Sequence, residues 1–220
     1  MNKLRKSSRF KGLLIPLMLL VLCSSGFGRI VSNYSPPAFA VLSAAANNIN
    51  AYVIQGGGAF LKSHSSVSNF LNLVEISEIY SADYVELQSL VDCAMQDMSQ
   101  AEYYYTQLNQ VAQATPYNPA VIDKLQTFNY RQFQTTHNLN PDIFWEVRRY
   151  LKSGDVRGVY QKMLLDAERI KGILGQLHMM LSNNRMPENS ILWKINQEFF
   201  TCLMFDQYTA MVFYEILMVQ

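Results

Sequence analysis

A single acidic residue interrupts an apolar helical stripe near the end of the chain. Leu192, Phe199, Asp206 and Phe213 recur every seven residues, which places all four on one face of a helix. Asp206 is therefore expected where its neighbours are buried, and burial raises the pKa of a carboxyl group unless a donor compensates. Two interpretations follow. Asp206 is either part of an internal polar pair that fixes the register of the helix, or a site for a ligand or a proton.

The candidate partners of Asp206 are basic residues of the preceding segments. His178 lies on the helix predicted just before that of Asp206, and Arg148, Arg149 and Arg169 are further candidates. A contact with any of them would compensate the buried acid. We take Asp206 with His178 as the candidate buried polar site.

Sequence motifs of metal binding and catalysis are absent. His64 and His137 fall in segments predicted as loops, and neither HExxH, nor Glu-x-x-His, nor two histidines at helical spacing occurs. No GxSxG motif occurs, and Gly56-Gly57-Gly58 is not followed by the lysine and hydroxyl residue of a phosphate-binding loop. We therefore predict no catalytic residue, no cofactor and no metal, and interpret the three glycines as a hinge or a helix end.

Five tyrosines gather on one predicted helix. Tyr103, Tyr104 and Tyr105 are consecutive, and Tyr80 and Tyr84 precede them. Successive residues of a helix point about 100° apart, so three consecutive rings cannot all face one core. At least one ring must meet solvent or a partner. The five tyrosines are therefore the predicted interaction patch.

The elements that must position these side chains are helices. No proline or glycine occurs between residues 67 and 114, and apolar residues recur there at heptad spacing. This pattern predicts one very long helix over residues 67–114. The Asn-Pro pairs at 118–119 and 140–141 predict two further helix starts, because asparagine accepts backbone N–H groups and proline suits the first helical position.

The remaining segments also favour helices. Residues 38–54 predict a helix that ends at the three glycines, followed by a polar loop over 63–68. Helical periodicity returns at 156–181 and 191–219, and no alternating strand pattern is convincing. The predicted fold is all-α: an elongated antiparallel bundle of five to six helices, with the helix over 67–114 as its spine.

The start of the chain has the pattern of a targeting segment. Basic residues precede an apolar run at 13–22, and small residues follow it at 24–26 and 28, which is typical of an export signal. Three fates are open for residues 1–28: cleavage near Gly28, lipidation at Cys23, or retention as a membrane anchor. The string LVLC that ends at Cys23 resembles a bacterial lipoprotein signal.

Export would place residues 29–220 in the periplasm or elsewhere in the cell envelope. We predict one helical domain there, with residues 37–62 either part of it or a separate, looser N-terminal helix. Cys93 and Cys202 are then an even pair in a compartment where disulfides persist. They are predicted to form either a disulfide between two helices or two buried thiols.

Charge and missing motifs together indicate the class of function. All 17 acidic residues follow residue 28, whereas five of the 18 basic residues precede it, so the domain is acidic and does not suit nucleic acid. We predict a non-enzymatic binding module (a scaffold, adaptor or sensor) whose partner is another envelope protein or a small ligand, with membrane contact only through the N-terminal segment. Two alternatives are a membrane-active protein that inserts residues 38–61, and an enzyme that uses Asp206 as a buried acid.

Overall fold

The computed structural model describes residues 46–77, 83–114 and 117–218, and the structural statements below concern these residues. They form seven helices, α3 to α9, and no strand. The prediction of an all-α protein is confirmed. The predicted export segment 1–28, with Cys23, lies outside the described residues, as does Tyr80.

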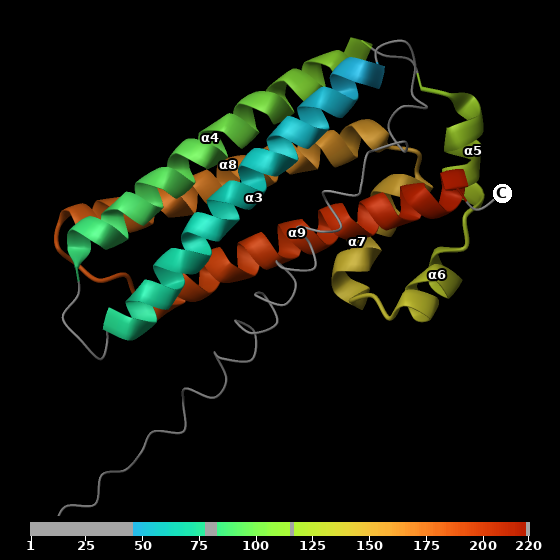
Figure 1. Cartoon of the computed structure of the whole chain (residues 1–220). Helices are drawn as coiled ribbons and strands as arrows, with labels where there is room; N and C mark the ends of the chain where they lie inside the picture. The colour runs from blue at the N-terminus through green and yellow to red at the C-terminus, as the bar shows by residue number, and fades with distance from the viewer. Residues whose placement is uncertain (1–45, 78–82, 115–116, 219–220) are drawn as a thin grey trace, which may run out of the picture. The chain divides into compact units, whose positions relative to one another are not determined.

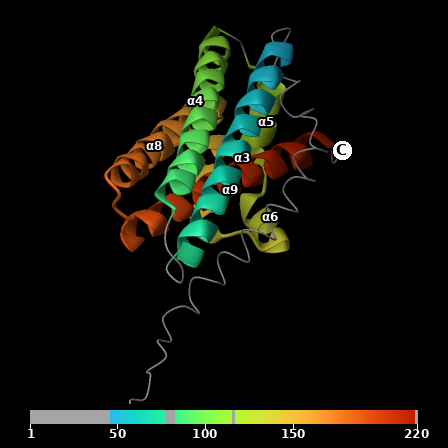
Figure 2. The same ribbon diagram turned by 60° about the vertical axis from the view of Figure 1, so that its left-hand side comes forward.

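Four long helices pack side by side. They are α3 (Ala46–Ser77), α4 (Tyr84–Ala114), α8 (Val156–Ser182) and α9 (Asn189–Met218). Each runs antiparallel to the long helix before it in the chain, and α4 lies between α3 and α8 (Figures 1 and 2). Packing in alternating directions is the arrangement of an antiparallel helical bundle.

Three short helices connect α4 to α8: α5 (Pro119–Thr127), α6 (Tyr130–His137) and α7 (Pro141–Lys152). The side chain of Asn118 accepts a hydrogen bond from a backbone N–H of the first turn of α5, and Asn140 does the same for two N–H groups of α7. Both Asn-Pro helix starts are therefore confirmed. Of the three short helices, α7 has contacts with α5, α6, α8 and α9, which fix it on the long helices.

The helix predicted over residues 67–114 is wrong, because the chain reverses direction within that range. Residues up to Ser77 belong to α3, and α4 begins at Tyr84 and runs back along α3. Asp83 caps the new helix: its Oδ1 accepts the N–H groups of Val85 at 3.0 Å and Glu86 at 3.2 Å. An acceptor side chain at the cap can start a helix without glycine or proline.

The predicted helix end at Gly56-Gly57-Gly58 is also wrong, since all three glycines lie inside α3. A Cβ at Gly56 would come within 2.5 Å of Cε1 of Tyr105, whereas a Cβ at Gly57 or Gly58 would meet nothing within 4 Å. Gly56 therefore lets the α4 ring lie directly on the α3 backbone. This close packing offsets the cost of glycine in a helix, about 1 kcal/mol per residue.

The polar segment 63–68 is helical as well, not the predicted loop. Ser63 is buried in α3 and its Oγ donates a hydrogen bond to the carbonyl of Ala94 on α4 at 2.8 Å. A buried serine that finds such an acceptor does not need water, so a polar run can sit inside a packed helix. Residues 46–62 are accordingly continuous with the rest of α3 rather than a separate helix.

The core is rich in aromatic side chains, and α9 supplies many of them. Phe199, Phe205 and Phe213 of α9 are fully buried, and the ring of Phe199 meets Phe60 of α3 with 5.2 Å between centroids. Each such side chain contributes about 1.5–3 kcal/mol when it leaves water. The apolar length of α9 is thus used in packing. Of the helices in the described ranges, none meets the length and hydropathy that a membrane span requires.

Candidate functional site

Asp206 lies on α9, half-buried, against two charged residues of α8. Burial, and after it the negative charge of Asp166, raises the pKa of Asp206 to about 7, although the positive charge of Lys162 opposes this rise. The heptad position thus brings the acid to a charged cluster between α8 and α9. Sequence analysis did not single out Lys162 or Asp166. The sequence pattern that could have identified this pair is two opposite charges four residues apart, next to an apolar helical stripe.

A chain of ion pairs joins α7, α8 and α9, and we call it the ion network. Lys162 Nζ lies 2.8 Å from Oδ2 of Asp166 and 3.5 Å from a carboxylate oxygen of Glu146. Arg169 bridges Asp166 and Glu198, at 2.9 Å from each. Lys162 and Asp166 are both buried, so each needs the other to compensate its lost hydration.

The ion network keeps its buried lysine charged. Burial alone would lower the pKa of Lys162, but the facing carboxylate of Asp166, followed by that of Glu146, raises it above its ordinary value. Arg169 responds in the same way to Asp166 and Glu198. The cations are therefore fixed in place by acids on three helices.

His178 does not pair with Asp206, so that candidate partnership is wrong. Nδ1 of His178 lies 2.6 Å from Oδ1 of Asp92 on α4, at an exposed position of α8. Arg148 and Arg149 lie on α7 and face away from the core. Among the candidate partners, only Arg169 belongs to the ion network, where it contacts Asp166 rather than Asp206. The heptad spacing identified Asp206 but not the charged residues near it, because those neighbours depend on how α8 and α9 align.

Cys93 and Cys202 are free thiols, so the disulfide that we considered between them is not formed. Cys93 is exposed on α4, and Cys202 is buried on α9. Burial, then the charges of Asp166 and Asp206, raise the pKa of the Cys202 thiol well above its ordinary value. A thiol that holds its proton so firmly is a poor nucleophile.

The tyrosines do not form one patch. Tyr103 is 59% exposed, which confirms that at least one of the three consecutive rings meets solvent, and its ring packs edge-on against Tyr104 at 5.4 Å. Tyr105 is fully buried instead. Tyr84 lies about 29 Å from Tyr103 along α4, at 1.5 Å per residue.

Tyr105 faces the ion network from α4. Its hydroxyl has no hydrogen-bond partner among the described residues. Burial, then the negative charges of Asp206 and Asp166, raise the pKa of that hydroxyl well above its ordinary value. The hydroxyl of Tyr105 therefore keeps its proton, and an uncharged side chain lies beside the two acids.

His64 and His137 are helical rather than in loops. His64 is buried in α3 with its ring 5.3 Å from that of Phe199, and burial lowers its pKa to about 4. His137 ends α6, and its ring lies 4.4 Å from that of Phe133. Within the described ranges, no three His, Cys, Asp or Glu side chains come together as metal ligands.

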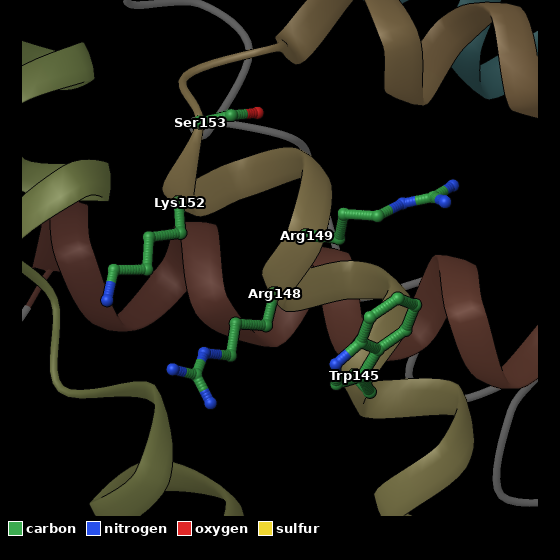
Figure 3. A pocket seen from close by; sticks show the side chains of 5 residues that line it. All are labelled: Trp145, Arg148, Arg149, Lys152 and Ser153. Atoms are coloured by element: carbon green, nitrogen blue, oxygen red, sulfur yellow. The ribbon is translucent and has the colours of Figure 1, made fainter.

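The surface of α7 carries a site that sequence analysis missed. Trp145, Arg148, Arg149, Lys152 and Ser153 line an open cavity of about 450 Å³ (Figure 3). Trp145 is 60% exposed, and the three cationic side chains are exposed as well. We call Trp145, Arg148, Arg149 and Lys152 the α7 strip.

The amphipathic sequence of α7 explains the strip. Its buried residues are Ile143, Phe144, Val147 and Leu151, which pack into the core. The members of the α7 strip stand at relative positions 0, 3, 4 and 7, which share the opposite face of the helix. Arg149 and Lys152 also lie in the last turn, where the helix dipole favours positive charge. The packing of the apolar face of α7 therefore leaves its cationic side chains on the outer face, and the helix dipole favours positive charge in its last turn.

The charges of the α7 strip are only partly compensated. The guanidinium of Arg149 lies 4.8 Å from the ring centre of Tyr150 and 3.8 Å from the carboxylate of Glu146, which also faces Lys162. Arg148 and Lys152 form no ion pair with any residue in the described ranges. Exposed guanidinium and ammonium groups of this kind bind carboxylates and phosphates.

Comparison of the chain with protein-family models, with curated proteins and with solved structures found no match. The arrangement of the residues must therefore indicate the function. The ion network has its charges satisfied internally, whereas the α7 strip exposes charge and an aromatic ring at the surface. Within the segment considered for membrane insertion, Ile49, Ala59 and Phe60 are buried in the bundle, whereas Ile54 is 55% exposed.

Proposed function

We propose that this chain is an exported, non-enzymatic binding module of the cell envelope, which contacts an anionic partner through the α7 strip. The observation that carries the proposal is the outward face of α7, where three cations and a tryptophan are exposed and Arg148 and Lys152 lack an ion pair within the described residues. The partner is another envelope protein or a small ligand with carboxylate or phosphate groups.

The fold suits a scaffold better than a reaction site. The long helices have 27 to 32 residues each and form an elongated antiparallel bundle on which α7 is displayed. The charged groups of the interior serve one another in the ion network, and the Cys202 thiol keeps its proton. The pattern of residues 1–28 supports the export step of the proposal.

The test places a photoreactive phenylalanine derivative at position 145 in cells that make and export the full chain. Irradiation followed by intact-mass measurement then reveals an added protein or ligand. The matched control carries the same derivative at position 193, because Trp193 is 62% exposed but lies on α9, away from the strip.

We expect adducts at position 145 that disappear when Arg148 and Lys152 are both replaced by glutamine, and no such adducts at position 193. Equal labelling at both positions, or labelling at 145 that ignores the loss of the two cations, would overturn the proposed function. No adduct at 145 would overturn it as well.

A further inference from the structure

We propose that the partner of the α7 strip is the surface of a bilayer that contains anionic phospholipids, on which α7 lies flat with lipid phosphates against its cations. This inference rests on the proposed function: of the partners proposed there, it takes the ligand with phosphate groups to be a phospholipid, presented in a bilayer surface. It adds a second membrane contact to the one predicted for residues 1–28.

The directions of the cationic side chains favour an extended anionic surface over a single small anion. In Figure 3, Arg148 and Lys152 extend to one side of α7, whereas Arg149 extends to the other, on the side of Trp145. A site for one phosphate or carboxylate needs donors that converge on it. Cations that diverge along an outer helix face can each meet a different headgroup of a charged surface.

Trp145 distinguishes a lipid surface from other polyanions. Its ring is 60% exposed among the cations of the strip. Indole has a large apolar body and one polar N–H group, and tryptophan is enriched where hydrocarbon meets water at a bilayer. A purely ionic partner, such as an acidic protein segment, gives this ring no comparable environment.

The buried face of α7 limits how far the helix can enter the bilayer. Its apolar residues, such as Phe144 and Leu151, are already in the core of the protein. Only Trp145 remains on the outer face to enter the headgroup region, so α7 lies on the membrane and does not insert. Attraction between cations and lipid phosphates must then supply most of the affinity.

The charge distribution of the molecule supports one orientation. No lysine or arginine occurs between Lys62 and Lys124, and α4, which falls in this interval, carries the acids Glu86, Asp92, Asp97 and Glu102. An anionic surface repels α4 and attracts the α7 strip. The predicted fates of residues 1–28 include lipidation and anchoring, and a single acyl chain needs a second signal, such as a basic patch, for stable membrane binding.

The experiment uses the two tryptophans of the chain as separate reporters. In the full chain with Trp193→Phe, fluorescence reports on Trp145; in the full chain with Trp145→Phe, it reports on Trp193. Each is titrated with vesicles of phosphatidylglycerol and phosphatidylcholine, with vesicles of phosphatidylcholine alone, and with inorganic phosphate. Residues 1–28 contain no tryptophan, so their own contact with vesicles gives no signal of this kind.

We expect the emission of Trp145 to shift to shorter wavelength only with the anionic vesicles, and the shift to weaken as salt is added. Emission of Trp193 should not change. Replacing Arg148, Arg149 and Lys152 together by glutamine should weaken the binding read by Trp145 about a hundredfold, since each cation near an anionic bilayer is worth roughly a factor of five.

Several outcomes would overturn the bilayer inference. They are an equal shift of Trp145 with phosphatidylcholine alone, an equal response of Trp193, a full response to inorganic phosphate, and no shift at all. A protein adduct at position 145 in cells, together with no shift on vesicles, would leave the proposed function standing and identify an acidic protein as the partner. Absence of both the adduct and the shift would overturn the two proposals together.

Discussion

The ion network and the α7 strip are two groups of charged residues that differ in burial and pairing: the network buries and pairs its charges, whereas the strip exposes them. In the network, the buried Lys162 and Asp166 are 2.8 Å apart, and the guanidinium of Arg169 lies 2.9 Å from the carboxylate of Asp166. In the strip, Arg148 and Lys152 point outward without an ion pair in the described residues. A buried charge is expensive unless it is paired, whereas an exposed cation costs little. Paired charges therefore hold the helices together, and unpaired exposed ones are available to another molecule.

The two groups meet at Glu146. Its carboxylate lies 3.5 Å from Lys162 of the network and 3.8 Å from Arg149 of the strip. One acid thus serves the interior and the surface at once. The comparison predicts that substitutions on the network side of Glu146 change stability, and that substitutions on the strip side change binding.

The largest effect is expected for Lys162→Met. The variant keeps most of the side-chain volume but leaves the buried carboxylate of Asp166 with only Arg169 beside it. Removing one partner of a buried ion pair costs about 3–5 kcal/mol of unfolding free energy. Urea unfolding followed by circular dichroism measures this loss.

Lys171→Met is the matched control for Lys162→Met. Lys171 pairs with Glu102 of α4, but both side chains are about one-third exposed. Its loss should cost at most about 1 kcal/mol. Equal losses for the two variants would show that burial does not distinguish the network from surface pairs.

The next-largest effect is expected at the contact between Tyr105 of α4 and Gly56 of α3. Gly56→Ala would place a methyl group 2.5 Å from the Tyr105 ring and force α3 and α4 apart. Such overpacking costs about 1–3 kcal/mol of unfolding free energy, measurable by urea unfolding. Gly57→Ala, in the same helix and with open space around it, should instead stabilise by about 0.5–1 kcal/mol. A stabilised Gly56→Ala variant would contradict the close contact.

Asp206→Asn tests the acid beside the network by its pH dependence. The folded protein holds a proton on Asp206 up to about pH 7, whereas the unfolded chain loses it near the ordinary value of 3.8. Stability contributed by this group is thus present at acid pH and is lost as the pH rises from about 4 through 7. Asparagine cannot ionise, so the unfolding free energy of the variant relative to that of the parent should rise as the pH goes from 4 to 8.

His64 acts in the opposite sense and must be separated from Asp206. Its pKa is lowered to about 4, so the unfolded chain takes up a proton that the folded protein resists, and stability is lost as the pH falls from 6.5 toward 4. Subtracting the unfolding free energy of Asp206→Asn from that of the parent at each pH removes the His64 contribution. A difference that does not vary between pH 4 and 8 would show that Asp206 does not titrate in this range.

Local patterns predicted the helices better than they predicted the partners of each helix. The starts at Asn118 and Asn140 depend on one side chain and the following N–H groups, so sequence sufficed. The reversal between α3 and α4 has a local signal too, Asp83 three residues before Glu86, as in a capping box. The absence of glycine and proline there favoured one continuous helix instead.

The remaining features depend on contacts between distant residues. Gly56 is explained by Tyr105 of another helix, and the partner of His178 is Asp92, which no spacing within α8 reveals. The α7 strip was visible as a helical pattern, but most surface helices show charged faces. Its significance required the finding that Glu146 is shared with Lys162, which leaves the cations of the strip under-compensated.

The smallest effect on stability is expected for the double variant Arg148→Gln with Lys152→Gln. Neither side chain has an ion pair in the described residues, so their loss should change the unfolding free energy by no more than about 0.5 kcal/mol. Binding to anionic vesicles should nevertheless weaken roughly 25-fold, at about a factor of five per cation. Arg149 is left in place because its contact with Glu146 would mix the two effects. A loss of stability as large as that of Lys162→Met would contradict this prediction. It would mean that the strip, like the network, stabilises the folded chain. Cations that act only in binding a partner can be removed without weakening the folded chain.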